Sequence, residues 1–466
     1  MKNLKIYKII LGLSAPLLLQ SCFVAKNYER PEVETENLYR TDQLSQDSTS
    51  LGMVSWRTLF KDPILERYID TALVNNLDIR MALQQIVASE AYLKQGKAGN
   101  YPTLNLNGTV TRQENSENSQ FGSIFNAPYE QYDLTASLSW EADIWGKIRS
   151  NKRAFEATYL QTIEAHKAVK TELIAALAST YYQLLSLDEQ LKITNETVEN
   201  REGSLETTKA LKDAGMVTEV AVKQTEAQLY TAKAIKIDLE NQIKLLENAF
   251  SILLAQPPHA IERSVLESQE IDQELTTGVP YLMLQNRPDV ASAEYGLINA
   301  FELTNVARSS FYPSITLSAS AGFQSLNFDD WIDASSIFNS LVGGLAQPIL
   351  NGRKIRTQFE VSKAQQESAL LNYKQTLLTA GREVSDALYS YQAAVDKIEA
   401  RQKEYEAYSL ATEYSEELLN QGLVNYLEVL TARENSLNSE LLLVENKYLR
   451  LNAVVTLYQA LGGGWQ

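Results

Sequence analysis

Few side chains in this chain of 466 residues have the types and spacing that chemistry requires. There is one cysteine, Cys22, and the two histidines, His166 and His259, are far apart and lack metal-ligand spacing. The sequence contains no glycine-rich phosphate loop and no nucleophile elbow. Scattered carboxylates are expected in a chain whose formal net charge is −16. We therefore predict that the chain is not an enzyme and holds neither a metal ion nor a dissociable cofactor.

The single cysteine ends a segment that is built like a targeting signal. Three lysines in the first eight residues form a basic start, and the apolar run 9–19 is too short for a permanent membrane helix. The letters LQSC that end at Cys22 resemble a bacterial lipoprotein signal, in which the cysteine becomes the acylated first residue. An ordinary secretory signal with a chance cysteine is the alternative. We predict a signal peptide at 1–21 and a lipid on Cys22.

The charge and the apolar pattern exclude nucleic acid as a partner and limit how the chain can cross a membrane. A chain of net charge −16 with no basic patch repels nucleic acid, so we predict no nucleic-acid binding. After the signal, no apolar run is long enough for a membrane helix. If the mature chain crosses a membrane, it must therefore do so with β-strands.

Four segments alternate between apolar and polar residues, as strands with two different faces do. The predicted strands are 104–111, 134–140, 315–323 and 339–348. Their length suits a tilted membrane strand, and their small hydroxyl and amide side chains suit a water-filled lumen. The connections, roughly 114–130 and 325–337, are long and polar. A small soluble β-domain is the alternative.

Four strands cannot close a barrel, because a closed transmembrane barrel needs at least eight. Two chains would supply eight strands and three chains would supply twelve, with a wider lumen. The strand pattern alone leaves both possibilities open.

Two very long helices are predicted at 147–213 and 354–421, since each segment has no proline and only one glycine. Apolar heptads support both helices and the helices that return from them. These heptad residues include Leu177, Leu184, Leu191, Val198 and Leu205 in the first copy, and Leu377, Val384, Tyr391, Ile398 and Tyr405 in the second. Gly215 and Gly422 suit left-handed C-caps, so each long helix turns there and forms an antiparallel coiled-coil hairpin.

The chain is therefore a duplication. The first copy has LDI at 77–79 and YPTLNL at 101–106, and the second has PDV at 288–290 and YPSITL at 312–317. The predicted segments are a signal peptide at 1–21, an N-terminal tether and equatorial segment at 22–62, a first repeat at 63–255 (helix, two strands, long helical hairpin), an equatorial linker at 256–286, a second repeat at 287–461 and a C-terminal tail at 462–466.

Short motifs in a fixed order add a family resemblance that covers essentially the whole chain. They are YERP at 28–31, FKDP at 60–63, NLD at 76–78, RPDV at 287–290, FYP at 311–313 and LGGGW at 461–465. With the duplication, they resemble the TolC-like outer-membrane factors, specifically the lipoprotein branch that serves tripartite efflux pumps of the resistance–nodulation–division (RND) type.

The resemblance implies a mainly α-helical chain with a small transmembrane β part. Three chains would form a homotrimer with a twelve-stranded β-barrel in the outer membrane of a Gram-negative bacterium, and their duplicated α-hairpins would form a helical barrel in the periplasm. A lipid on Cys22 would anchor each chain. The implied partners are a periplasmic adaptor (membrane fusion) protein, an inner-membrane RND-type transporter and outer-membrane lipid, and the implied function is the export of small molecules.

The resemblance also implies which residues act. An acidic gate position falls on Glu428, and the second falls on Thr431, which departs from the acidic pattern. A ring of three Glu428 carboxylates would favour cations, whereas a solvated helix-face glutamate is the alternative. The hairpin-tip residues expected to contact the adaptor are Gly215, Met216, Val217, Thr218, Gly422, Leu423, Val424 and Asn425. Exposed apolar residues at a tip favour a partner.

Two other functions stay open. One is the exit duct of a type I protein secretion system, and the other is a periplasmic coiled-coil adaptor, which would be extractable without detergent.

Overall fold

The computed structural model describes residues 24–32, 50–120, 127–269 and 286–466. The predicted signal peptide and Cys22 lie outside these residues. The chain divides into two compact units. Unit 1 comprises 1–32, 86–161 and 293–373, and unit 2 comprises 33–85, 162–292 and 374–466.

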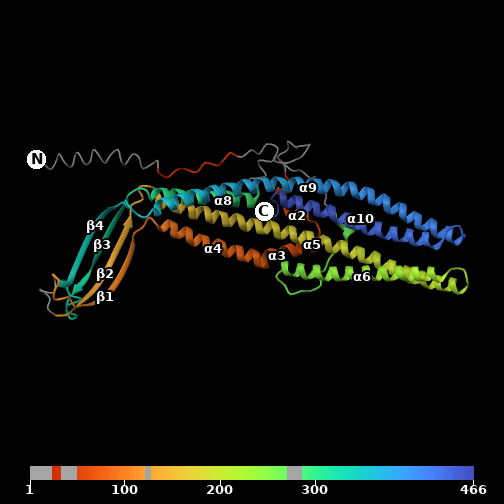
Figure 1. Ribbon diagram of the computed structural model, residues 1–466, viewed down its shortest axis with the longest axis horizontal. Helices are drawn as coiled ribbons and strands as arrows, with labels where there is room; N and C mark the ends of the chain where they lie inside the picture. The colour runs from red at the N-terminus through yellow and green to blue at the C-terminus, as the bar shows by residue number, and fades with distance from the viewer. Residues whose placement is uncertain (1–23, 33–49, 121–126, 270–285) are drawn as a thin grey trace. The chain divides into compact units, whose positions relative to one another are not determined.

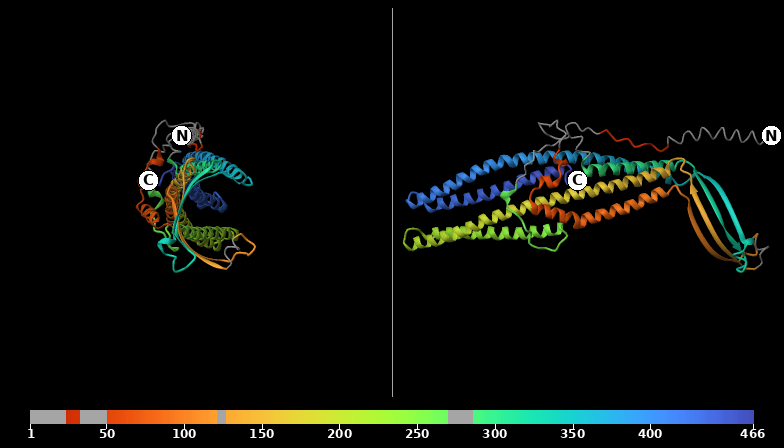
Figure 2. Two further views of the ribbon diagram at one scale, coloured as in Figure 1. Left: turned by 90° about the vertical axis from the view of Figure 1, so that its left-hand side faces the viewer. Right: turned by 180° about the vertical axis from the view of Figure 1, so that it is seen from behind.

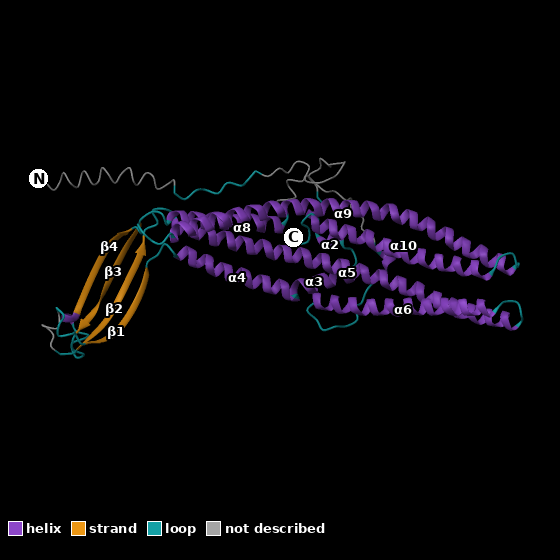
Figure 3. Ribbon diagram, viewed as in Figure 1, coloured by secondary structure: helices purple, strands orange, loops and turns teal. Residues whose placement is uncertain are grey.

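Helices dominate the described residues, and four strands accompany them (Figures 1 and 3). The helices are α2 (Trp56–Leu59), α3 (Pro63–Asn75), α4 (Leu77–Ala98), α5 (Lys147–Asp213), α6 (Glu219–Leu253), α8 (Pro288–Ser309), α9 (Lys354–Asn420) and α10 (Tyr426–Ala460). The strands are β1 (Thr103–Gln113), β2 (Tyr129–Glu141), β3 (Ser314–Ser325) and β4 (Ile337–Ala346). Within the described ranges, no helix is both long enough and apolar enough to cross a membrane.

Unit 1 contains one antiparallel sheet with strand order β1-β2-β3-β4 (Figure 3). Leu104 lies opposite Leu138, and Leu134 lies opposite Phe323, so apolar residues of neighbouring strands share a face. The sheet joins strands from both copies of the repeat through β2 and β3. This leaves β1 and β4 as its two edges.

The predicted strands are present, and all four differ from the prediction at their ends, most clearly β2 and β4. β4 begins at Ile337, two residues before the predicted start, and it ends at Ala346. β2 already begins at Tyr129, inside the predicted connection. Both ends are set by backbone pairing with a neighbouring strand, for example Ile337 with Phe323, and not by side-chain alternation.

Among the described residues, no apolar core covers the apolar face of the sheet. Leu104, Leu106 and Val110 of β1 are 70%, 72% and 61% exposed, and Leu341 of β4 is 73% exposed. A soluble β-domain would bury such residues, because each buried leucine stabilises the fold by about 1.5–3 kcal/mol.

Unit 2 is built on the two helical hairpins, α5 with α6 and α9 with α10 (Figure 2). The predicted heptad residues hold them together: Leu177 and Leu184 are fully buried, as are Leu377 and Val384 of the second copy. The absence of proline lets each long helix run uninterrupted for 67 residues.

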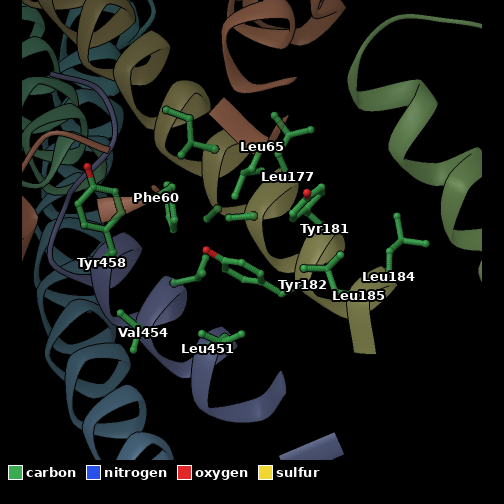
Figure 4. Packing of buried hydrophobic residues seen from close by; sticks show 14 of the residues in the cluster. Phe60, Leu65, Leu177, Tyr181, Tyr182, Leu184, Leu185, Leu451, Val454 and Tyr458 are labelled. Atoms are coloured by element: carbon green, nitrogen blue, oxygen red, sulfur yellow. The ribbon is translucent and has the colours of Figure 1, made fainter. Parts of the chain in front are cut away.

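The largest apolar core of the described residues lies in unit 2, where the start of α3 meets α5 and α10 (Figure 4). Phe60 is fully buried, with its ring 6.0 Å from that of Tyr458 and 6.4 Å from that of Tyr182. These three rings fasten the N-terminal segment of unit 2 to helices from both repeats.

A buried carboxylate, Asp62, ties the linker to this core. It accepts hydrogen bonds from Ile64 N (2.8 Å), Tyr181 Oη (2.9 Å), Gln269 Nε2 (2.8 Å) and Ser264 Oγ. Burial alone would raise the pKa of Asp62, but these hydrogen bonds, the one from Ser264 most, outweigh burial and lower that pKa. Asp62 therefore stays ionised in the core.

The duplication is visible in equivalent joints at the bases of the two hairpins in unit 2. Asn76 Nδ2 donates to the carbonyl of Leu253 at the end of α6 (2.9 Å). In the second copy, Arg287 Nη1 donates to the carbonyl of Ala460 at the end of α10 (2.8 Å). Each joint fastens the residue that precedes a 22-residue helix to the last turn of a 35-residue helix.

Left-handed backbone also recurs at equivalent positions 207 residues apart. Positive φ angles occur at Gly146 (78°) and Arg353 (66°), at Gly215 (77°) and Gly422 (70°), and at Ala255 (57°) and Gly462 (80°). The architecture fixes this conformation, because it persists where one member of a pair is not glycine.

Candidate functional site

Both hairpin tips in unit 2 are helix C-caps of the same geometry, as the two glycines predict. Gly215 N donates to Lys212 O (2.8 Å), and Met216 N donates to Leu211 O (2.9 Å). This pair of hydrogen bonds satisfies the last carbonyls of α5 around a residue with positive φ, the arrangement that favours glycine. Gly422 and Leu423 repeat it at the end of α9.

The returning helices begin differently. Thr218 caps α6 without a side-chain hydrogen bond. Asn425 caps α10: its Oδ1 accepts from Glu428 N (3.2 Å), and its Nδ2 donates to Glu428 Oε1 (3.4 Å). Glu428 is therefore exposed at the third position of α10, where a carboxylate is favourable next to the helix dipole. Thr431 is also exposed, and its hydroxyl donates to Leu427 O.

The apolar tip residues divide into two kinds. Met216 and Leu423 are 73% and 68% exposed, as predicted. Val217 and Val424 are half-buried, so the prediction that both valines are exposed was wrong. The two exposed side chains follow the glycines directly, and Val220 of α6 and Leu427 of α10, 64% and 54% exposed, add a second exposed apolar residue near each tip.

Charge distinguishes the first tip from the second. Lys212 Nζ at the end of α5 lies 3.0 Å from Glu219 Oε2 at the start of α6, and this hydrogen bond raises the pKa of Lys212. The equivalent positions in the second copy are Leu419 and Tyr426. An ion pair thus spans the first turn, and the second turn has a leucine and a tyrosine at those positions.

Near the second tip, α10 is fastened to both helices of the first hairpin. Arg201 of α5 donates to Glu434 Oε2 of α10 (2.9 Å) and to Gln228 O of α6 (2.6 Å). Thr208 Oγ1 of α5 donates to Tyr426 Oη (3.1 Å). The guanidinium of Arg201 is 5% exposed, so its ion pair is shielded from solvent on one side.

A second arginine adds to these contacts between the two hairpins, which we call the seam. Arg433 of α10 pairs with Glu416 of α9 (2.7 Å) and donates to Ser204 Oγ of α5 (2.7 Å). These side chains line a polar cleft of about 400 Å³ between α5, α9 and α10. Polar contacts therefore hold the second hairpin against the first in this part of unit 2, in addition to buried apolar residues of α10 such as Leu430 and Leu437.

Sequence reasoning missed the seam, although it left a signal. Thr194, Arg201 and Thr208 are spaced by seven residues and are all buried, beside the leucine heptad of α5. A polar heptad line next to an apolar one indicates a second buried helix face. Its partners were not predictable, because Glu434 is 233 positions away from Arg201.

The two histidines contribute no reactive group to this site. His166 lies in α5, where burial and Lys170 lower its pKa. His259 lies in the linker and contacts Ser251 and the carbonyl of Pro257. The described part of the chain contains no group of three or more His, Cys, Asp or Glu residues that could hold a metal ion.

Comparisons with known proteins match this architecture over both copies. The family model described as "Outer membrane efflux protein" matches residues 68–256 and 279–463. The "Cation efflux system protein CusC" of Escherichia coli O6:H1 is 27% identical over 460 residues, which cover 98% of this chain and 99% of that protein. The "Solvent efflux pump outer membrane protein SrpC" of Pseudomonas putida is 29% identical over 464 residues, which cover 98% of each chain.

A solved structure shares the fold as well. The crystal structure of CusC, described in connection with folding and transmembrane channel formation, superposes with a TM-score of 0.83 at 26% identity. The match covers 94% of this chain and 99% of that chain. The mainly helical fold with four antiparallel strands is thus that of solved outer-membrane channels.

Proposed function

The chain belongs to the outer membrane efflux protein family, and on that premise we propose that it is the outer-membrane channel of a tripartite efflux system. It passes small molecules from an inner-membrane RND-type transporter and a periplasmic adaptor to the exterior. The transporter supplies the energy. No catalytic role is part of this proposal.

The observation that carries the proposal is the four-stranded sheet of unit 1. Its edge strands, β1 and β4, each pair with a neighbour on one side only within the described sheet, and several of its apolar residues are exposed in the single chain. An exposed edge pairs readily with another strand. We propose that β1 of one copy pairs with β4 of the next, that three copies close a twelve-stranded barrel, and that lipid covers its apolar face.

The tips supply the other end of the duct. Glu428 lies at the start of α10, exposed and directed by Asn425, and three copies around an axis would form a carboxylate ring that favours cations. Thr431, one turn later, would add a ring of hydroxyls. We propose that the exposed Met216 and Leu423 at the tips contact the adaptor, because an apolar side chain without a core is stabilised by a partner.

The cargo is a separate question from the channel. The two relatives are named for different cargoes, cations and solvents. We propose that the transporter selects the cargo and that this chain supplies a common exit, anchored by a lipid on Cys22.

Native mass spectrometry of the detergent-extracted membrane fraction tests the proposal. We expect a complex of three chains, each carrying the mass of a lipid. A water-soluble monomer or dimer without lipid would contradict the channel and support a periplasmic coiled-coil protein instead.

A further inference from the structure

The described N-terminal segment, residues 24–32, lies along α8 in unit 1; we name it the strap. The backbone N–H and C=O of Lys26 are both hydrogen-bonded by one side chain. Lys26 N donates to Asn305 Oδ1 (3.2 Å), and Asn305 Nδ2 donates to Lys26 O (2.9 Å). A side-chain amide thereby pairs with a peptide as a neighbouring strand would.

Further contacts extend this pairing in both directions. Arg308 Nη1 donates to Val24 O (3.3 Å). The Tyr28 ring meets the Phe301 ring edge-on, with centroids 5.6 Å apart. Farther along, the guanidinium of Arg30 binds both carboxylate oxygens of Glu294.

The contacts follow one register. Strap residues 24, 26, 28 and 30 meet α8 residues 308, 305, 301 and 294, so every second strap residue faces the helix and the strap runs antiparallel to it. Six residues of extended chain span about 20 Å. Fourteen residues of helix span about 21 Å. The two lengths are of the same order, and the strap has neither turn nor bend from Lys26 to Arg30, after a turn at Val24 and a bend at Ala25.

Asn305 itself cannot turn away. It is 1% exposed, and its Nδ2 also donates to Glu302 Oε2 (3.2 Å). Glu302 is in turn bound by Arg153 of α5 through Nε (2.7 Å) and Nη2 (2.9 Å). Because these partners fix its rotamer, Asn305 presents a preformed donor and acceptor to the strap.

The strap leads to the junction between the sheet and α5. Gly146, which precedes α5, lies so close to Ala25 that a Cβ on Gly146 would come within 2.9 Å of the Ala25 side chain. The neighbouring Trp145 stacks on Tyr312, with ring centroids 4.9 Å apart. Such aromatic residues at the end of a sheet are typical of a membrane–water interface.

We infer that Asn305 and Arg308 are positioning residues that clamp the strap in register on α8 and thereby hold the lipid-bearing end of the chain at the level of Trp145 and Tyr312. This inference rests on the proposed lipid attachment. Cys22 precedes Val24 by two residues, which span at most about 7 Å. If the clamp is lost, the next polar contact is at Arg30, and the unclamped length from Cys22 grows to eight residues, or about 28 Å.

Limited trypsin digestion of the full-length, membrane-extracted protein tests the clamp, because Lys26 is a cleavage site within the strap, whereas the bond after Arg30 resists trypsin since Pro31 follows it. The variants are Asn305→Ala and Arg308→Gln. The control is Asn299→Ala, which removes an equivalent amide of α8 that bonds Ala154 O and Thr158 and does not touch the strap. We expect cleavage after Lys26 to be about ten-fold faster in both clamp variants and unchanged in the control.

Equal cleavage rates in the wild type and both clamp variants would overturn the inference, as would equal acceleration in Asn299→Ala. If Asn305→Ala fails to fold, Arg308→Gln decides alone. Hydrogen exchange of residues 147–161 reports whether unit 1 remains folded. The mass of the released peptide 22–26 shows separately whether a lipid is attached, so failure of the lipid proposal is distinguishable from failure of the clamp.

Discussion

Ala255→Gly should stabilise the end of α6, although glycine usually weakens a helix. Ala255 has a φ of 57° and is exposed, and its equivalent in the second copy is Gly462, with a φ of 80°. A left-handed L-residue costs about 1–2 kcal/mol. Glycine removes this cost, but its greater freedom in the unfolded chain destabilises the folded state by about 0.5–1 kcal/mol. The net stabilisation is therefore about 0.5–1 kcal/mol.

Hydrogen exchange is the appropriate assay, because it reports local opening without unfolding the whole protein. Gln256 N donates to Ser251 O across this cap (2.9 Å), so its amide reports on the cap directly. We expect exchange of a peptide covering 250–256 to slow about two- to five-fold in Ala255→Gly.

Two controls make the expectation refutable. Ala249→Gly places the same substitution inside α6 and should speed local exchange, since it costs about 0.5–1 kcal/mol. Gly462→Ala should destabilise the end of α10, because its Cβ would lie 2.9 Å from Asn286 O. If Ala255→Gly exchanges as fast as the wild type or faster, left-handed strain at this position is refuted.

Three further predictions concern the core and the tips. The folded state lowers the pKa of Asp62, so the stability that this carboxylate contributes is complete above about pH 4 and is lost as pH falls through its lowered pKa. Asp62→Asn should therefore reduce the unfolding free energy at pH 7 and flatten its acid-dependent loss. Denaturant titration between pH 2 and 7 measures both effects. Glu428→Gln keeps the shape of the cap but removes the charge, so it should weaken cation preference in planar bilayers, and an unchanged selectivity would remove Glu428 from the constriction. Leu423→Asp should abolish efflux-dependent resistance in cells while the complex still assembles, whereas normal resistance would show that this tip is not a coupling surface.

The helices were predictable because their signals are local. The absence of proline and the leucine heptads predicted that α5, Lys147–Asp213, is one continuous helix, and Gly215 predicted the turn that follows. The ends of β4 were less predictable, because pairing with β3 decides them and the glycine-rich strand has little side-chain alternation.

Contacts between distant segments set the limit of prediction for the site. Both turn glycines were found from their type and position, but the burial of Val217 and Val424 depends on how each turn folds back on its own hairpin. The ion pair of Arg201 with Glu434 joins different repeats, and one sequence shows only that Arg201 lies on a polar heptad line.

The joints at Asn76 and Arg287 have a mechanical consequence. Each closes a loop of chain, one of 177 residues ending at Leu253 and one of 173 residues ending at Ala460. Each joint ties the base of a returning helix, α6 or α10, to the residue before α4 or α8, so a pull along the returning helix is also passed to the start of that other helix. The two joints differ in chemistry: the first depends on a neutral amide, and the second depends on an arginine that is also paired with Asp289 and Glu383.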